Sequence, residues 1–169
     1  SAGECFDKIA RKLNLGYPGG PEISKRSELS NNNKFIFPRP MIKSNDYNFS
    51  FSGLKTHVIN TIHKLELTDE HINNISYEVQ SAIVDTLISK SVEASKNLGI
   101  KNIVITGGVS ANQKLRKDFS CIKECKAYFP DVKFSTDNGA MIAYAGFLKT
   151  NSSDFKKNFT IKPEPSLTL

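Results

Sequence analysis

The residues best suited to binding an anion lie in one short turn. Residues 106–112 read Thr-Gly-Gly-Val-Ser-Ala-Asn. Gly107 and Gly108 let the backbone approach a ligand closely, and a helix that starts after them offers free N–H groups and a partial positive charge. Asn112 adds an amide that can donate to and accept from a ribose or a base edge. Two glycines in such a turn are equally compatible with a purely steric role. The turn is not a Walker A loop, because no Gly-Lys-Ser/Thr ends it.

One carboxylate is placed where it could cap a helix or hold a metal. Asp137 lies between a predicted strand and a predicted helix. A cap is the commoner role of Asp at that point, and metal ligation is the alternative. The histidines His57, His63 and His71 are six and eight residues apart, so they do not share one helical face. A metal site made entirely from this chain is therefore not expected.

Acidic side chains and glycines also combine near the start of the chain. Glu4 and Asp7 lie at the beginning of a predicted helix, where the helix dipole favours them in any case. Alternatively, a carboxylate here could grip ligand hydroxyls, with Gly20 of a Pro-Gly-Gly-Pro turn giving close backbone access. No Ser-His-Asp or Cys-His spacing indicates a nucleophile.

Positioning these segments requires regular elements. Periodicity and caps predict helices over residues 5–13, 54–65, 69–98, 111–122 and 140–147, with Ser110 as the cap of the helix over 111–122. The turn of residues 15–21 opens a further short helix, with Pro21 in its first turn. Strands are predicted over 35–37, 46–51, 103–105 and 132–134, and the first two could pair as a hairpin. In the last third, two units of strand, glycine turn and helix indicate an α/β fold. Both turns would lie at the carboxyl ends of neighbouring strands, where open α/β sheets bind ligands. We expect one domain over residues 1–150 and a tail over 151–169.

Composition and charge set wide limits on the class of protein. The chain has 169 residues, of which 38% are hydrophobic and 24% charged, as is typical of a globular domain. The net charge of +6 permits an anionic partner such as nucleic acid. The lysines are nevertheless spread along the sequence, and a solvated basic surface is the plainer interpretation.

The cysteines and the chain start bear on the compartment. Three cysteines without a regular framework suit a reducing compartment. Cys121 and Cys125 are four apart on a predicted helix, with no second Cys/His pair to complete a metal site. No apolar stretch approaches a membrane span and no signal peptide is evident, so we expect a cytoplasmic protein. Because the sequence does not begin with Met, we expect a processed or truncated chain.

Four segments together resemble the TsaD family. They are residues 1–21 (SAGECFDKIARKLNLGYPGGP), 49–55 (FSFSGLK), 105–116 (ITGGVSANQKLR) and 136–143 (TDNGAMIA). This is the family of tRNA threonylcarbamoyladenosine biosynthesis proteins, long labelled glycoproteases or O-sialoglycoprotein endopeptidases. The resemblance covers almost the whole chain, in the family's order. It implies the C-terminal lobe of an actin/sugar-kinase/Hsp70-like ATPase fold, helix-rich with a small sheet.

The resemblance also implies roles for individual residues. The positions that match substrate or nucleotide contacts of the family are Asp7, Gly20, Ser24, Gly107, Gly108 and Asn112. Ser24 stands where the family usually has an acidic residue, a departure that could weaken ribose binding. Asp137 matches a metal ligand. The family's other ligands are a His-x-x-x-His pair in an N-terminal lobe that this chain lacks.

The implied function is that of the C-terminal part of a tRNA N6-adenosine threonylcarbamoyltransferase. Such an enzyme moves threonylcarbamoyl from threonylcarbamoyl-AMP to the N6 amine of an adenosine beside the anticodon. The implied cofactors are a divalent metal, iron (Fe2+) or zinc, with ATP or threonylcarbamoyl-AMP as the nucleotide ligand. The implied partners are tRNA, TsaB-like and TsaE-like accessory proteins and the missing lobe, besides self-association. We expect no membrane partner.

Two other classes of function stay open at this point. A metalloprotease follows from the old family label, but the chain has no metal-binding His pair or general-base motif. A non-catalytic paralogue or interaction module is the other, against which the presence of Asn112 and Asp137 argues. The chain by itself is expected to be inactive, and no catalytic residue is assigned to it.

Overall fold

The computed structural model describes residues 1–30 and 34–150, which form two units divided between Thr136 and Asp137. The predicted tail over residues 151–169 lies outside the described residues. The first unit contains α1 (Ala2–Lys12), α2 (Gly19–Ser27), α3 (Ser52–Ile62), α4 (Asp69–Leu98), β1 (Asn102–Val104), η1 (Gly108–Ala111), α5 (Gln113–Ser120), β2 (Lys126–Tyr128) and η2 (Val132–Phe134). The second unit contains α6 (Gly139–Thr150).

The long helix α4 forms where the sequence predicts it because both of its ends are capped. Thr68 accepts a hydrogen bond from the backbone N–H of His71 at 3.2 Å, and His71 Nδ1 accepts from the N–H of Thr68 at 3.4 Å. This is a capping box in which histidine replaces the usual Glu or Gln. Gly99 ends the helix in the left-handed conformation, with φ of 68°. The caps and the apolar stripe were enough to predict this element.

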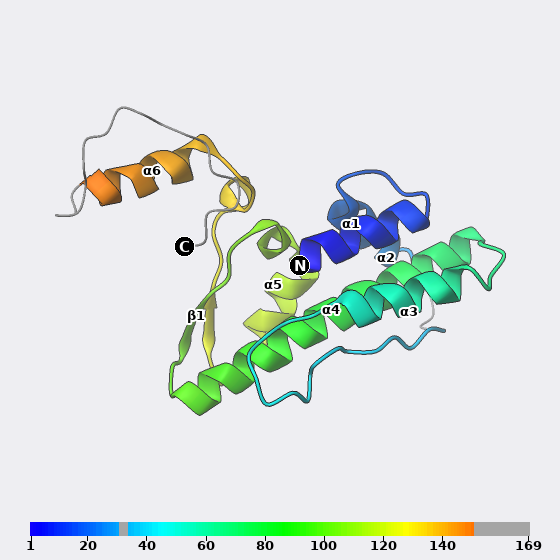
Figure 1. Cartoon of the computed structure of the whole chain (residues 1–169), viewed down its shortest axis with the longest axis horizontal. Coiled ribbons are helices and arrows are strands. Elements are labelled where there is room, and N and C mark those ends of the chain that lie inside the picture. The colour runs from blue at the N-terminus through cyan, green and yellow to red at the C-terminus, as the bar shows by residue number, and fades with distance from the viewer. Residues whose placement is uncertain (31–33, 151–169) are drawn as a thin grey trace. The chain divides into compact units, whose positions relative to one another are not determined.

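Two apolar clusters hold the first unit together. In the first, the helix α2 packs against both α1 and α4, and α1 packs against α3 (Figure 1). Phe6 and Ile9 of α1 and Ile23 of α2 are no more than 2% exposed. The second cluster lies between the other end of α4 and the sheet, and it contains Leu115 and Phe119 of α5. Through α4, one continuous element supports both the α1–α2 pair and the β1–α5 region.

The small sheet confirms a helix-rich α/β chain but differs from the prediction in one strand. Strands β1 and β2 are parallel, with Ile103 paired to Ala127. The predicted strand over residues 132–134 is wrong, since these residues form the 3-10 turn η2. The second predicted glycine turn therefore does not follow directly from a strand.

Two further sequence predictions were wrong. Helix α5 ends at Ser120, so Cys121 is its exposed C-cap and Cys125 is a buried residue before β2. The predicted hairpin of residues 35–37 with 46–51 does not form. Residues 34–51 lack strand pairing and are extended apart from a turn at 40–43 and a bend at 45–47. No helix within the described residues is long and apolar enough to cross a membrane.

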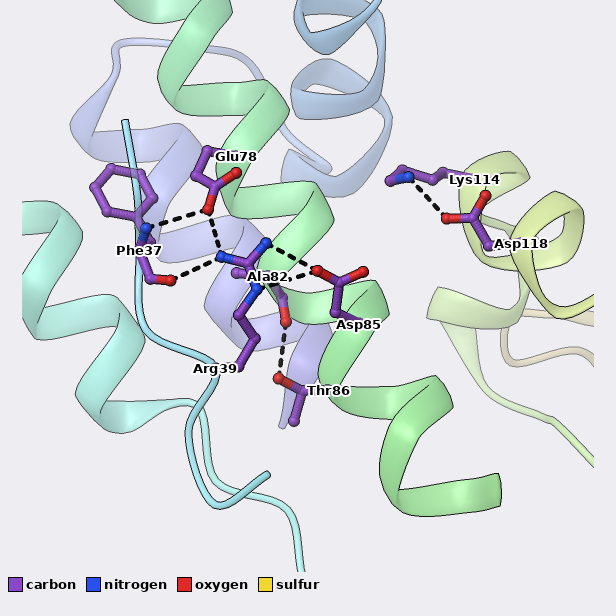
Figure 2. Close-up of polar contacts among 8 residues, drawn as sticks. All are labelled: Phe37, Arg39, Glu78, Ala82, Asp85, Thr86, Lys114 and Asp118. Atoms are coloured by element: carbon purple, nitrogen blue, oxygen red, sulfur yellow. Dashed lines mark hydrogen bonds and ion pairs between the residues drawn. The ribbon is translucent and has the colours of Figure 1, made fainter. Parts of the chain in front are cut away.

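Side chains of α4 hold this extended segment in place. Arg39 lies between two carboxylates of α4 and is bonded to Glu78 and to Asp85, the latter at 2.8 and 3.0 Å (Figure 2). The buried Glu78 also accepts from the backbone N–H of Phe37 at 3.1 Å. The Glu78 carboxylate thus accepts the hydrogen bond that the N–H of Phe37 would otherwise donate to a partner strand.

A second attachment lies further along α4. Lys90 is 1% exposed, and its ammonium group donates to Met41 O at 2.9 Å, Ser44 Oγ at 2.6 Å and Asp46 O at 2.8 Å. The buried charge is stabilised because each of these oxygens accepts one of its protons. Together with Arg39, it fixes residues 37–46 along α4.

Candidate functional site

Asp7 and the turn before α2 meet through one hydrogen bond. The backbone N–H of Gly19, the first residue of α2, donates to Asp7 Oδ1 at 2.7 Å. Gly19 is packed so tightly that an added Cβ would lie 2.7 Å from Asp7 Cα and 2.8 Å from Phe6 O. Gly20 differs, because an added Cβ would meet nothing within 4 Å. Gly19 therefore serves the packing of α1 on α2, whereas the backbone of Gly20 is open to a ligand.

Ser24 and Asn112 are brought together although 88 residues separate them in sequence. Asn112 Nδ2 donates to Ser24 Oγ at 3.1 Å and to Gln80 Oε1 at 2.8 Å. Ser24 Oγ donates to the same Gln80 oxygen at 2.6 Å. Gln80 Nε2 in turn donates to Ser27 Oγ at 2.8 Å, and Ser27 Oγ to the carbonyl of Ser24 at 2.6 Å. We call Ser24, Ser27, Gln80 and Asn112 the polar network.

Asn112 also has a structural role in the polar network. Its Oδ1 accepts from the N–H of Leu115 at 2.9 Å, so Asn112 is the N-cap of α5. The sequence pattern favoured Ser110 as the cap, which is wrong. Ser110 is fully buried, and its hydroxyl donates to Ser135 Oγ at 2.9 Å. Both N–H groups of the Asn112 amide have acceptors within the chain, and a second lone pair of Oδ1 remains for a ligand.

The glycine turn lies beside this network and next to the start of α1. Gly107 has φ of 85°, a conformation that side-chain-bearing residues rarely adopt. An added Cβ on Gly107 or Gly108 would meet nothing within 4 Å, so the turn is open. An added Cβ on Gly3 would lie 3.8 Å from Val109 Cγ2, which places the beginning of α1 against η1. Six predicted positions, Asp7, Gly20, Ser24, Gly107, Gly108 and Asn112, thus belong to one unit.

Asp137, the remaining predicted site residue, belongs to the other unit. It is the first residue of the second unit and is exposed. Asn138, rather than Asp137, caps α6, because its Oδ1 accepts from the N–H of Met141 at 3.0 Å. Within residues 1–30 and 34–150, no three His, Cys, Asp or Glu side chains are grouped to hold a metal ion. The described residues thus do not by themselves provide a metal site.

Two other polar groups of α1 are each held by their surroundings. The Glu4 carboxylate is hydrogen-bonded to Lys8, and this bond lowers the pKa of Glu4. Cys5 is 3% exposed, and burial raises the pKa of its thiol to about 11. A thiol with that pKa remains protonated at neutral pH and is a poor nucleophile. Of Glu4 and Asp7, Asp7 is the one that bonds to the start of α2.

Gln80 and Gly19 are the residues that sequence reasoning missed. Gln80 is 5% exposed and interrupts the apolar face of α4 beside Val79 and Ile83. A polar residue on a buried stripe needs a hydrogen-bonding partner, and this was the available signal. For Gly19, the sequence offered only a pair of adjacent glycines. It did not tell which glycine packs and which one lies open.

The first unit therefore defines a helix-rich α/β protein in which an open glycine turn lies beside a buried polar network. Comparison with protein families gives the particular family. The family model described as TsaD, tRNA N6-adenosine threonylcarbamoyltransferase, matches residues 1–144. The chain belongs to the TsaD family.

Relatives with the name tRNA N6-adenosine threonylcarbamoyltransferase support this membership. The protein from Thermosipho africanus is 45% identical over 172 residues, which cover 100% of this chain and 52% of the relative. The proteins from Ralstonia pickettii and Caldicellulosiruptor saccharolyticus are 43% and 46% identical, each over 88% of this chain and 45% of the relative. The chain spans about half the length of the curated relatives it matches, and it corresponds to their C-terminal part.

Proposed function

We propose that this chain is the C-terminal part of a tRNA N6-adenosine threonylcarbamoyltransferase. The whole enzyme would transfer the threonylcarbamoyl group of threonylcarbamoyl-AMP to the N6 amine of an adenosine in tRNA. Family membership over residues 1–144 supports the assignment. The observation that carries it is the convergence of the polar network with the open turn at Gly107 and Gly108.

The chemistry of these groups suits the adenosine part of such a donor. A ribose offers hydroxyl groups, and Asn112 Oδ1 and Ser24 Oγ each keep a lone pair that can accept a hydrogen bond from a hydroxyl. The open backbone of Gly20 near the start of α2 and the open turn at Gly107 allow a ligand to approach closely. In our proposal these residues bind and orient the nucleotide. We assign no catalytic nucleophile or general base to the described residues.

The remaining features of the family are proposals of the same kind. We infer that this chain belongs to a lobe of the actin/sugar-kinase/Hsp70-like ATPase fold. We infer that a divalent metal, iron or zinc, is bound through Asp137 with ligands from outside this chain, since one carboxylate cannot fix a transition metal. Such a metal would polarise the donor's carbonyl or phosphate oxygens. The proposed partners are tRNA, TsaB-like and TsaE-like proteins and an N-terminal lobe, in the cytoplasm.

Calorimetry of nucleotide binding tests the proposal. We expect this chain alone to bind ATP weakly, because contacts from an N-terminal lobe are missing while the cost of association remains. Adding a separately produced N-terminal lobe should strengthen binding and restore transfer of threonylcarbamoyl to tRNA, with the accessory proteins held constant. Robust transfer by this chain alone would contradict the role of the missing lobe and that of Asp137.

The same preparation separates the other classes of function. Cleavage of a glycoprotein substrate that a chelator abolishes would instead indicate a metalloprotease. Failure of the chain and lobe together to bind any adenine nucleotide would indicate an interaction module. Either outcome would replace the proposed function.

A further inference from the structure

A basic hollow lies on the first unit, among residues that the proposed nucleotide site does not use. It measures about 460 Å³ and lies between the C-terminal end of α5 and the amino ends of the two strands. We define the basic hollow by its four cationic lining residues, Lys101, Arg116, Lys123 and Lys126. Glu124 is the one acidic residue in the lining. Over the whole chain the ratio is 23 basic to 17 acidic residues, so positive charge is concentrated here.

Strand pairing brings these charges together. Lys101 directly precedes β1, and Lys126 is the first residue of β2. The backbone N–H of Lys126 donates to Lys101 O at 2.7 Å, so the parallel register places residues 25 positions apart side by side. Arg116 comes from α5, and Lys123 from the turn that joins α5 to β2. In the sequence the lysines are spread, and the fold gathers them.

Two features strengthen the positive potential of the basic hollow beyond the count of its lining charges: the pairing of Glu124 with Lys96 and the fixed position of Arg116. Lys96 lies 3.6 Å from the Glu124 carboxylate and offsets its charge. Arg116 is a fixed cation, since its Nε donates to Ser110 O at 2.7 Å and its Nη2 to Pro130 O at 2.6 Å. Its guanidinium also stacks 5.0 Å from the centre of the Phe129 ring. Other N–H groups of the same guanidinium remain for an anion.

The exposed lysines complete the surface. Lys101, Lys123 and Lys126 are all exposed, and Lys126 Nζ lies 4.9 Å from the centre of the half-exposed Tyr128 ring. Several separate cations beside an aromatic ring are typical of surfaces that follow a nucleic acid backbone.

We propose that the basic hollow binds the phosphodiester backbone of RNA. This inference rests on the proposed function, which makes tRNA the substrate, and it names a contact surface separate from the nucleotide site. Six residues of extended chain, roughly 20 Å, separate Lys101 from Gly107. An RNA that presents one base near the glycine turn is several times longer than that span and can lie along the hollow at the other end of β1.

The geometry favours a polyanion over a single small anion. Phe119 and Ser120, at the C-terminal end of α5, contribute to the lining, and the carbonyl end of a helix disfavours a deeply seated anion. The lysine ammonium groups instead reach outward on flexible stems into solvent, where each can meet a different phosphate. Binding of this kind depends steeply on salt because each neutralised phosphate releases counterions.

The test uses the full chain and bulk tRNA as the probe, in a filter-binding series over a range of salt concentrations. The triple variant Lys101→Ala, Lys123→Ala and Lys126→Ala should reduce affinity about tenfold or more at low salt. It should also lower the slope of log affinity against log salt by roughly 2 to 3, close to one per phosphate contact. Arg116 is retained because its bonds to two backbone carbonyls support the fold.

A matched triple variant with the same change in charge provides the control. Lys12→Ala, Lys43→Ala and Lys64→Ala remove three exposed lysines that lie outside the hollow, and should change the slope by less than one. Equal losses in both triple variants would overturn the proposal, because binding would then follow net charge alone. Poly-glutamate of matched charge that binds the chain as tightly as tRNA would also overturn it, in favour of an acidic protein partner.

Nucleotide binding by the same variants separates this proposal from the proposed function. The hollow variant should bind ATP, in the presence of an N-terminal lobe, as the unchanged chain does. In one outcome, the unchanged chain with the N-terminal lobe binds no nucleotide, while the hollow variant loses tRNA affinity and the control variant does not. The proposed function then fails and the RNA surface stands. If nucleotide binds normally and the hollow variant retains tRNA affinity and salt slope, the RNA surface fails.

Discussion

Replacing Asn112 by alanine should destabilise the protein more than the loss of an ordinary helix cap. Asn112 makes three hydrogen bonds with its side chain: it accepts from Leu115 N–H at 2.9 Å and donates to Gln80 and Ser24 at 2.8 and 3.1 Å. Alanine removes all three. The variant therefore changes a cap and the polar network in one step.

The magnitude follows from the partners that remain. Loss of an N-cap costs about 1 kcal/mol of unfolding free energy. Each of the two other hydrogen bonds contributes about 1 kcal/mol, and less where the partner keeps another bond. Gln80 Oε1 keeps its bond from Ser24, so its desolvation penalty is reduced. We expect Asn112→Ala to lower the free energy of unfolding by about 2 to 3 kcal/mol.

Thr68→Ala provides the matched control, because Thr68 caps α4 through a single side-chain acceptor and lies outside the polar network. It should cost about 1 kcal/mol. Asn112→Asp keeps an acceptor for the α5 cap but sets an oxygen against Gln80 Oε1, so it should lose the network alone. Urea unfolding followed by circular dichroism measures all three. The reasoning is refuted if Asn112→Ala costs no more than Thr68→Ala.

Four further predictions concern single residues. Gly19→Ala should destabilise the fold by about 1 to 3 kcal/mol, because its Cβ would overlap the backbone of α1. Gly20→Ala replaces a helical glycine that has free space around it, so it should keep or slightly raise thermal stability while weakening nucleotide binding. Equal thermal shifts for Gly19→Ala and Gly20→Ala would contradict this. Arg39→Met removes the guanidinium partner of a buried α4 carboxylate and should cost roughly 2 to 3 kcal/mol in urea unfolding. Cys5 is protonated in the fold up to a pKa of about 11 against its usual value of 9.0, so its stabilising contribution is present below pH 9 and is lost as pH rises toward 11. Alkylation at pH 8 should accordingly modify the exposed Cys121 before Cys5, as mass spectrometry of the peptides would show.

The helices were predictable because their signals are local. Thr68 and Gly99 mark the two ends of α4, and an apolar stripe between them fixes its buried face. Such signals depend on residues at most a few positions apart. The sequence therefore predicted α1, α4 and the turn into α2 before any long-range contact was known.

The short strands were not predictable to the same degree. Residues 35–37 (Phe-Ile-Phe) and 132–134 (Val-Lys-Phe) have the composition of strands, but such short segments do not reveal whether a partner strand exists. The first run is held by Glu78 and Arg39, and the second forms a 3-10 turn. The actual strand β2 reads Lys-Ala-Tyr, which has little apolar character, and its pairing with β1 defines it. Strand β2 could not be predicted from its own three residues, because it is defined by its pairing with β1.

The candidate site was predicted through family motifs, because spacing alone could not unite its parts. Nothing in the interval of 88 residues between Ser24 and Asn112 indicates that their side chains touch. The contact exists because α2 packs on α4 and α5 begins beside the same stretch of α4. The motifs named the two residues, and the structure added Gln80, the side chain that links them.

The hydrogen bond to Gln80 explains why a serine fits at position 24. Ser24 Oγ donates to Gln80 Oε1 and accepts from Asn112 Nδ2, so this position must both donate and accept. A carboxylate at this position, which the family resemblance led us to expect, would only accept, and it would face the oxygen of Gln80 unless the glutamine amide turned over. After such a turn Gln80 would present its oxygen to Ser27, whose hydroxyl already donates to the Ser24 carbonyl. A hydroxyl at position 24 therefore fits the present orientation of the amide. It also keeps one lone pair with which to accept a hydrogen bond from a ligand hydroxyl.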